Sequence, residues 1–136
     1  MATFDPRRLP DPPSEPSFHP WTFRPEVAQV ARRTRLPGCR VEAVDGRVGT
    51  VVDASLAPDN SYLVVVLSRW PFGKRTQLPA GTVNHIDAEA RRVYVDRSAQ
   101  IVKAAPLVLP EAYDDPASRA AIAEYYRSTY RAHLNQ

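Results

Sequence analysis

The chain has 136 residues, a formal net charge of +3 and a single cysteine, Cys39. This length suits one domain and leaves little room for a second independent core. One cysteine excludes an intrachain disulfide, and no stretch approaches the roughly 20 apolar residues that cross a bilayer. Composition therefore predicts a soluble cytoplasmic protein whose only membrane contact would be peripheral, at the inner face.

The first part of the chain differs in composition from the rest, because half of the 14 prolines fall within its first 25 residues. Proline removes amide donors and favours extended backbone before it, so residues 1–37 are predicted to form an extended arm. A short helix is expected within it, over Pro25–Arg33. The arm's large aromatic residues either pack on the chain's own core or dock on another molecule. They are Phe18, Trp21 and Phe23.

Three arginines, Arg32, Arg33 and Arg35, close this predicted helix. Cations at a helix C-terminus complement the helix dipole, which is a sufficient structural reason for their presence. The alternative is that they contact nucleic acid. The sequence leaves both interpretations open.

Residues 38–106 show short β-branched runs separated by turn signals, which is typical of a meander of strands. Asp45-Gly46 predicts a tight hairpin. Five or six strands in under sixty residues would leave edges prone to aggregation unless the sheet closes on itself. We therefore predict a mainly β fold, a small barrel of five to six antiparallel strands. The predicted strands are Arg40–Val44, Arg47–Ala54, Tyr62–Leu67, Lys74–Leu78, Thr82–Ile86 and Arg92–Val95.

Residues 107–136 are predicted to form a linker followed by an amphipathic helix. Asp115-Pro116 is a strong start signal, and the helix is expected to run to about His133. A shorter helical turn, capped by Ser98, is predicted before the linker. The apolar seam of the long helix packs on the barrel or on another subunit, and it consists of Ile122, Tyr126, Tyr130 and Leu134.

The strongest binding signal is the predicted loop Arg69–Arg75, which mixes two large aromatic residues with cations. Tryptophan and arginine are over-represented among residues that dominate interface energies. In the alternative interpretation, Trp70 and Phe72 turn inward to seal the barrel. The candidate partner-binding residues of the loop, arm and C-terminal helix are Arg69, Trp70, Phe72, Lys74, Arg75, Trp21, Phe23, Tyr126 and Tyr130.

The sequence offers no pattern for catalysis, a metal or a cofactor. The three histidines, His19, His85 and His133, lack the spacing of metal ligands, and no glycine-rich phosphate loop follows a strand. Cys39 is expected to fill the core rather than act as a thiolate. We therefore predict a non-enzymatic protein without metal or cofactor.

Five segments of the chain have the order and spacing that is typical of a known family. They are Val44–Val51 with its Asp-Gly hairpin, Gly73–Pro79 ending in Leu-Pro, Val83–Asp87, Val93–Val95 and Ala105-Pro106. Together they resemble the PRC-barrel family, named for the cytoplasmic domain of the H subunit of photosynthetic reaction centres. The resemblance covers roughly Cys39 to Pro106. It implies a small bacterial barrel that docks to other macromolecules without a common active site, and it implies a homodimer.

The expected function is that of an adaptor or scaffold that binds another protein or assembly through its barrel, arm and C-terminal helix. The alternative is a ribosome- or RNA-associated maturation factor, favoured by the isoelectric point of about 9.3, the basic loop and one branch of the family. A second alternative is a peripheral subunit of a membrane electron-transfer complex, by analogy with the reaction-centre domain.

Overall fold

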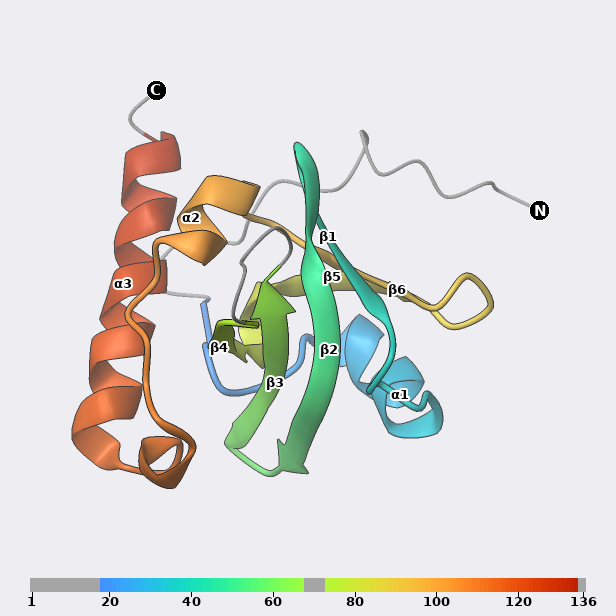
Figure 1. Cartoon of the computed structure of the whole chain (residues 1–136), viewed down its shortest axis with the longest axis horizontal. Coiled ribbons are helices and arrows are strands. Elements are labelled where there is room, and N and C mark those ends of the chain that lie inside the picture. Colours follow the sequence, from blue (N-terminus) through green and yellow to red (C-terminus); the bar gives the residue numbers. More distant parts are fainter. Residues whose placement is uncertain (1–17, 68–72, 135–136) are drawn as a thin grey trace.

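A computed structural model describes residues 18–67 and 73–134 of the chain (Figure 1). Within these residues a strongly curved sheet lies between a long C-terminal helix on one side and a short N-terminal helix on the other. The elements in chain order are α1 (Pro25–Arg33), β1 (Arg40–Ala43), β2 (Gly46–Ala57), β3 (Asn60–Leu67), β4 (Arg75–Pro79), the 3-10 turn η3 (Ala80–Thr82), β5 (Val83–Asp87), β6 (Arg92–Val95), α2 (Ala99–Lys103), the 3-10 turn η4 (Pro110–Ala112) and α3 (Pro116–Leu134).

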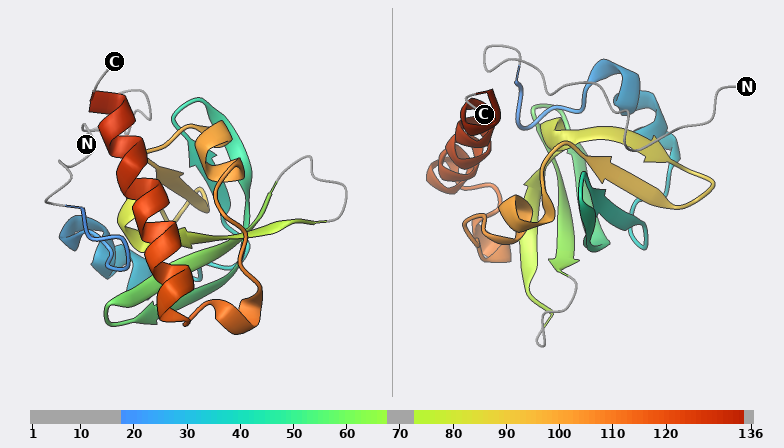
Figure 2. Two further views of the ribbon diagram at one scale, coloured as in Figure 1. Left: turned by 90° about the vertical axis from the view of Figure 1, so that its left-hand side faces the viewer. Right: turned by 90° about the horizontal axis from the view of Figure 1, so that it is seen from above.

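The sheet has six strands in the order β4-β3-β2-β1-β6-β5. β1 pairs antiparallel with β2 but parallel with β6, and the remaining pairs are antiparallel. The prediction of an all-antiparallel, closed, mainly β barrel is therefore wrong. The fold is mixed α/β, with an open mixed sheet. In Figure 2, β5 and β6 run across the direction of β2, β3 and β4, so the sheet curls without closing.

The backbone explains why the two edge strands do not join. β4 ends at Pro79, which has no amide proton to donate, and η3 then turns the chain into β5. The N-terminal segment occupies backbone groups at this point, because the Gly81 amide donates to Pro20 O at 2.8 Å and the Ser61 amide donates to Trp21 O at 2.9 Å. A Cβ atom at Gly81 would lie 2.2 Å from His19 O, so this close approach requires glycine.

One register row crosses the sheet on its core side, and we call it the inner row. Gly49 lies in the middle of it, where a Cβ atom would meet Val66 O at 2.0 Å. The other members are buried, as expected for the face of a sheet that packs on a hydrophobic core. In strand order the inner row consists of Ile86, Val93, Val41, Gly49 and Leu67.

The helices begin where local signals predicted. α1 has proline in its first turn and buries Val27 and Ala31, and its bounds match the prediction. The Ser98 side chain accepts a hydrogen bond from the Ile101 amide at 3.2 Å and caps α2. At the start of α3, Asp115 Oδ2 accepts from the Ser118 amide at 3.0 Å. Each of these starts depends on contacts within four residues, which sequence patterns register directly.

α3 packs on its own chain through the first two residues of the predicted seam, and the side chains of the other two, Tyr130 and Leu134, lie outside the described part of the chain. Ile122 and Tyr126 are fully buried. The Tyr125 hydroxyl donates to Ile101 O of α2 at 2.5 Å. The helix therefore covers one side of the molecule, as Figure 2 shows.

Candidate functional site

The face of the sheet that points away from the core carries a second register row, and we call it the outer row. It crosses all six strands, because each member is the pairing partner of the next. Residues in register lie on the same side of a sheet, with Cβ atoms about 5 Å apart on adjacent strands. From β5 to β4 the outer row consists of Asp87, Arg92, Arg40, Thr50, Val66 and Arg75.

Three members of the outer row, Arg40, Arg92 and Arg75, are exposed arginines. None of them forms an ion pair within 4 Å with any residue that the structure describes. Arg92 lies beside the Tyr94 hydroxyl, whose hydrogen bond raises the pKa of its guanidinium, as do the carboxylates of Glu42 and Asp87. The row is therefore cationic and only partly compensated.

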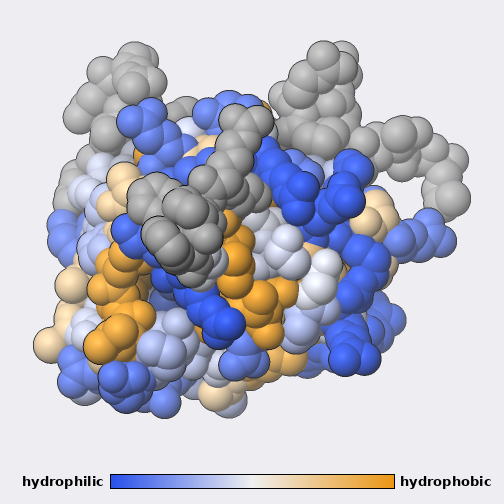
Figure 3. All heavy atoms as spheres, viewed as in Figure 1, coloured by the Kyte–Doolittle hydropathy of each residue, from blue (hydrophilic) through white to orange (hydrophobic). Residues whose placement is uncertain are grey.

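A structural arginine borders the row where the β5–β6 turn meets the start of β1. Arg91 has a positive φ of 57°, and its guanidinium donates to Arg35 O and, at 2.9 Å, to Pro37 O. Its own carbonyl accepts from the Arg40 amide at 2.9 Å. These bonds hold Arg91 of the turn beside Arg40 of β1. Figure 3 shows hydrophilic side chains gathered over this side of the molecule.

The other half of the same face is covered by the linker that precedes α3. The Gln77 side chain donates to Tyr113 O at 3.1 Å, and the Tyr113 and Tyr62 rings pack edge to face with centroids 5.6 Å apart. In the described part of the chain, the half that carries the outer row leaves Arg40, Arg75 and Arg92 exposed. The linker thus divides the face into a packed half and a cationic half.

The sequence-predicted loop joins the two strands at the β4 end of the outer row. Arg69, Trp70 and Phe72 lie outside the described residues. Lys74 is half-buried, and its carbonyl accepts from the Leu67 amide at 2.8 Å, while Arg75 is exposed. The structure therefore places Arg75 in the same row as Arg40 and Arg92, which the sequence did not connect.

The aromatic candidates of the arm pack on the chain itself. Phe23 is buried, and Trp21 lies edge-on to Tyr62 with ring centroids 6.3 Å apart. The guanidinium of Arg119, from α3, stacks over the Trp21 ring at 5.2 Å. Of the two interpretations for Phe18, Trp21 and Phe23, the structure shows packing on the chain's own core.

Of the two tyrosine candidates in α3, the structure describes the side chain of Tyr126 but not that of Tyr130. Tyr126 is fully buried, so it presents no surface to a partner in this structure. Burial raises the pKa of the Tyr126 hydroxyl. The side chain of Tyr130 lies outside the described part of the chain, and its role as a contact stays a prediction.

A second set of arginines forms a buried network that sequence reasoning missed. Asp96 bridges Arg24 and Arg97 through ion pairs from its two carboxylate oxygens. The Arg97 guanidinium also donates to Thr129 Oγ1 at 2.5 Å and to Tyr126 O at 2.8 Å. The network joins the N-terminal segment, the end of β6 and α3. Arg24 and Asp96 alone lie 72 residues apart, so no local pattern could reveal the network.

The structure offers no metal site among the described residues, because no group of three or more His, Cys, Asp or Glu side chains gathers there. Cys39 is fully buried, and its thiol lies 3.6 Å from Arg35 O. Burial raises the pKa of this thiol, with a smaller opposing effect from Arg91. None of the described helices is both long and apolar enough to span a bilayer.

A comparison with models of protein families finds no match for the chain, and a comparison with curated proteins finds none either. Membership of the PRC-barrel family therefore stays a prediction. Among solved structures, the chain is similar to a putative 16S ribosomal RNA processing protein, RimM, from Pseudomonas aeruginosa, at 24% identity and a TM-score of 0.39. The match covers 48% of this chain and 42% of that protein, so it spans less than half the length of either. A likeness at this level carries no conclusion about function.

Proposed function

We propose that this chain is a non-enzymatic, RNA-associated protein that contacts the phosphate backbone of RNA through its outer row. The observation that carries the proposal is the register pairing of Arg40 with Arg92 on adjacent strands, both exposed. The proposal depends on this arrangement of charges and not on the distant likeness in fold.

Two like charges directly opposite each other on neighbouring strands destabilise a sheet unless an anion lies between them. Glu42 and Asp87 lie near Arg92. Arg40 has no ion pair with any described side chain. A phosphate group between the two guanidinium groups would accept charge-assisted hydrogen bonds from both. The pair is therefore suited to bind an oxyanion.

The length of the row favours a chain of phosphates over one isolated anion. Arg40 and Arg75 are separated by three strand spacings, about 14 Å along the sheet. The residues between them, Thr50 and Val66, offer one hydroxyl and one apolar surface. The side chains of the outer row can position an RNA backbone, but few of them can form hydrogen bonds with base edges. We therefore expect binding with little preference for RNA sequence.

The test is the binding of a fluorescein-labelled 12-nucleotide uridine RNA, followed by fluorescence anisotropy between 50 and 300 mM salt. We expect affinity to fall with salt, by a slope of about 0.7 on logarithmic axes for each phosphate neutralised. The triple variant Arg40→Gln/Arg75→Gln/Arg92→Gln is expected to lose up to about fivefold in affinity for each arginine removed, and its slope is expected to be shallower.

The matched control is Arg32→Gln, which removes one exposed arginine from α1, away from the outer row. Its affinity and slope are expected to match the wild type. Circular dichroism checks that every variant is folded. Wild-type affinity and slope in the folded triple variant would contradict the proposal. Equal losses in Arg32→Gln and in Arg40→Gln would show that only overall charge matters.

A further inference from the structure

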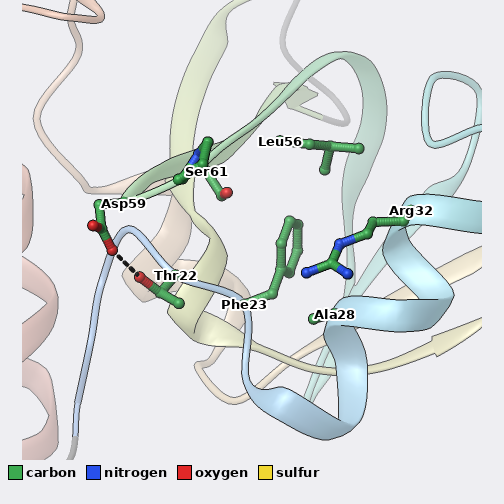
Figure 4. A pocket seen from close by; sticks show the side chains of 8 residues that line it. Thr22, Phe23, Ala28, Arg32, Leu56, Asp59 and Ser61 are labelled. Atoms are coloured by element: carbon green, nitrogen blue, oxygen red, sulfur yellow. Dashed lines mark hydrogen bonds between the residues drawn. The ribbon is translucent and has the colours of Figure 1, made fainter.

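A groove lies between α1 and the end of the β2–β3 hairpin, on the opposite side of the sheet from the outer row. Its volume is about 460 Å³. Figure 4 shows Phe23 at its floor, Leu56 on the hairpin wall, and Ala28 and Arg32 on the helix wall. The groove therefore combines apolar walls with one cation, Arg32, on the helix wall and one acid, Asp59, at the hairpin end.

The hairpin wall is apolar because it continues the core face of the sheet. Leu56 pairs with Ser61, and two residues along each strand Ala54 pairs with the fully buried Leu63. Side chains two apart point to the same side of a strand, so Leu56 faces the core side. It is nevertheless 45% exposed. Among the described residues nothing covers this extension of the core face.

The backbone of β2 also has a free edge beside the groove. Pairing with β1 ends near Thr50, where the Val51 amide donates to Cys39 O at 2.9 Å and Val51 O accepts from the Gly38 amide at 2.7 Å. From residue 52 to residue 57, the described strands offer β2 only one neighbour, β3. A free edge next to a pocket is the arrangement that recognises extended peptides by strand addition.

Arg32 supplies the positive charge of the groove. Its side chain is exposed and makes no hydrogen bond or ion pair with the residues described. The acid at the other end, Asp59, keeps its charge, and its carboxylate accepts a hydrogen bond from Thr22 Oγ1 at 3.4 Å, while its backbone carbonyl accepts from Arg119 at 2.6 Å. The groove thus attracts a negative charge at the helix wall.

From these features we propose that the groove binds an extended segment of a partner protein that carries an apolar side chain next to a carboxylate. The apolar side chain lies between Phe23 and Leu56, the carboxylate pairs with Arg32, and the segment's backbone bonds to the free edge of β2 near Leu56. This site goes beyond RNA binding, because apolar walls contribute nothing to the recognition of phosphates. Protein and RNA would then occupy opposite sides of one sheet.

The test uses two fluorescein-labelled hexapeptides, one of alternating aspartate and leucine and one of alternating lysine and leucine. Anisotropy is expected to show tighter binding of the aspartate peptide to the full chain. Arg32→Gln is expected to weaken it about fivefold, as expected for one exposed ion pair. Leu56→Ser is expected to weaken it on the order of tenfold, through loss of apolar contact.

Reversing the charge of Arg32 gives the clearest outcome. Arg32→Glu is expected to bind the lysine peptide more tightly than the aspartate peptide. The substituted position is exposed on a helix, and circular dichroism checks that the variant is folded. Arg40→Gln, on the outer row, is the control and is expected to leave peptide binding unchanged.

Three results would overturn the proposal. The first is equal binding of the two peptides to the wild type, with no change in Arg32→Glu. The second is competition by octanoate at affinities equal to the peptide's, which would assign the groove to small organic acids. The third is displacement of the peptide by the uridine RNA, which would make the groove part of the RNA surface. Because Arg32 is the test position for the peptide and the control for RNA, and Arg40 the reverse, either proposal can fail alone.

Discussion

Two sets of arginines in this molecule differ in their surroundings. Arg24 and Arg97 belong to the buried network, with side chains 13% and 3% exposed, and both pair with Asp96. Arg40 and Arg92 stand side by side on the open face of the sheet. A buried charge needs a partner, because desolvation is too costly otherwise, whereas an exposed charge does not. The same residue type therefore stabilises the fold in one place and is available to a ligand in the other.

The comparison separates the arginines that hold the fold from the arginines that are open to a ligand. Arg97 also contacts two aromatic rings, with its guanidinium carbon 5.3 Å from the Phe18 ring centre and 5.7 Å from that of Tyr126. These contacts account for its position without a ligand. No comparable set of contacts surrounds Arg40 in the described residues. Four substitutions sharpen or break this distinction.

The largest effect is expected at the centre of the buried network. Asp96→Ala leaves Arg24 and Arg97 without their shared carboxylate, and breaking a buried ion pair in this way costs about 3–5 kcal/mol of unfolding free energy. Urea denaturation measures the change. The exposed Glu89→Gln is the matched control, expected within about 0.5 kcal/mol of wild type. A cost below about 1 kcal/mol for Asp96→Ala would show that the network is not structural.

An intermediate effect is expected at Tyr126, whose hydroxyl is buried without a hydrogen-bond partner among the described residues. Because a buried unpaired polar group is costly, Tyr126→Phe is expected to raise the unfolding free energy by about 1 kcal/mol. Tyr125→Phe removes the hydroxyl that donates to Ile101 O, and is expected to lower it by about 1 kcal/mol. The same denaturation assay compares the two, and changes of equal sign would refute the assignment.

The smallest effect on stability is expected on the outer row. Arg40→Gln removes an exposed cation that faces Arg92 across the strands, so the unfolding free energy is expected to stay within about 0.5 kcal/mol of wild type. Any change should be toward greater stability at low salt, where the repulsion is least screened. A loss above about 1 kcal/mol would mean that Arg40 is a structural residue.

Local signals in the sequence were sufficient for the helices and for most strands. Pro25, Ser98 and Asp115 each act on neighbours within four residues, and the helices start where these residues predict. The hairpin between β1 and β2 also forms, but its turn lies one residue earlier than predicted, at Val44-Asp45, and Gly46 begins β2 paired with Ala43. Where structure depends on close neighbours in the chain, the sequence is a reliable guide.

Long-range pairing was beyond the reach of the same reasoning. The parallel pairing of β1 with β6 joins residues some fifty positions apart, so the sequence could not place Arg40 beside Arg92. The barrel prediction failed for a related reason, since the N-terminal segment, far away in the sequence, bonds to the backbone of Gly81 and Ser61 beside the end of β4. Asp96-Arg97 resembled an ordinary strand end, because its partner Arg24 lies far away in the chain.

The most direct test of the account is a titration of the ¹⁵N-labelled protein with the 12-nucleotide uridine RNA, followed by NMR at 50 mM salt. We predict chemical-shift changes at the backbone amides of Arg40, Arg92 and Arg75, and at their Nε groups. The groove residues Leu56 and Arg32 should stay unchanged. Shifts confined to the groove and α1, or no shifts at all, would contradict the claim that the exposed arginines of the outer row form the RNA contact.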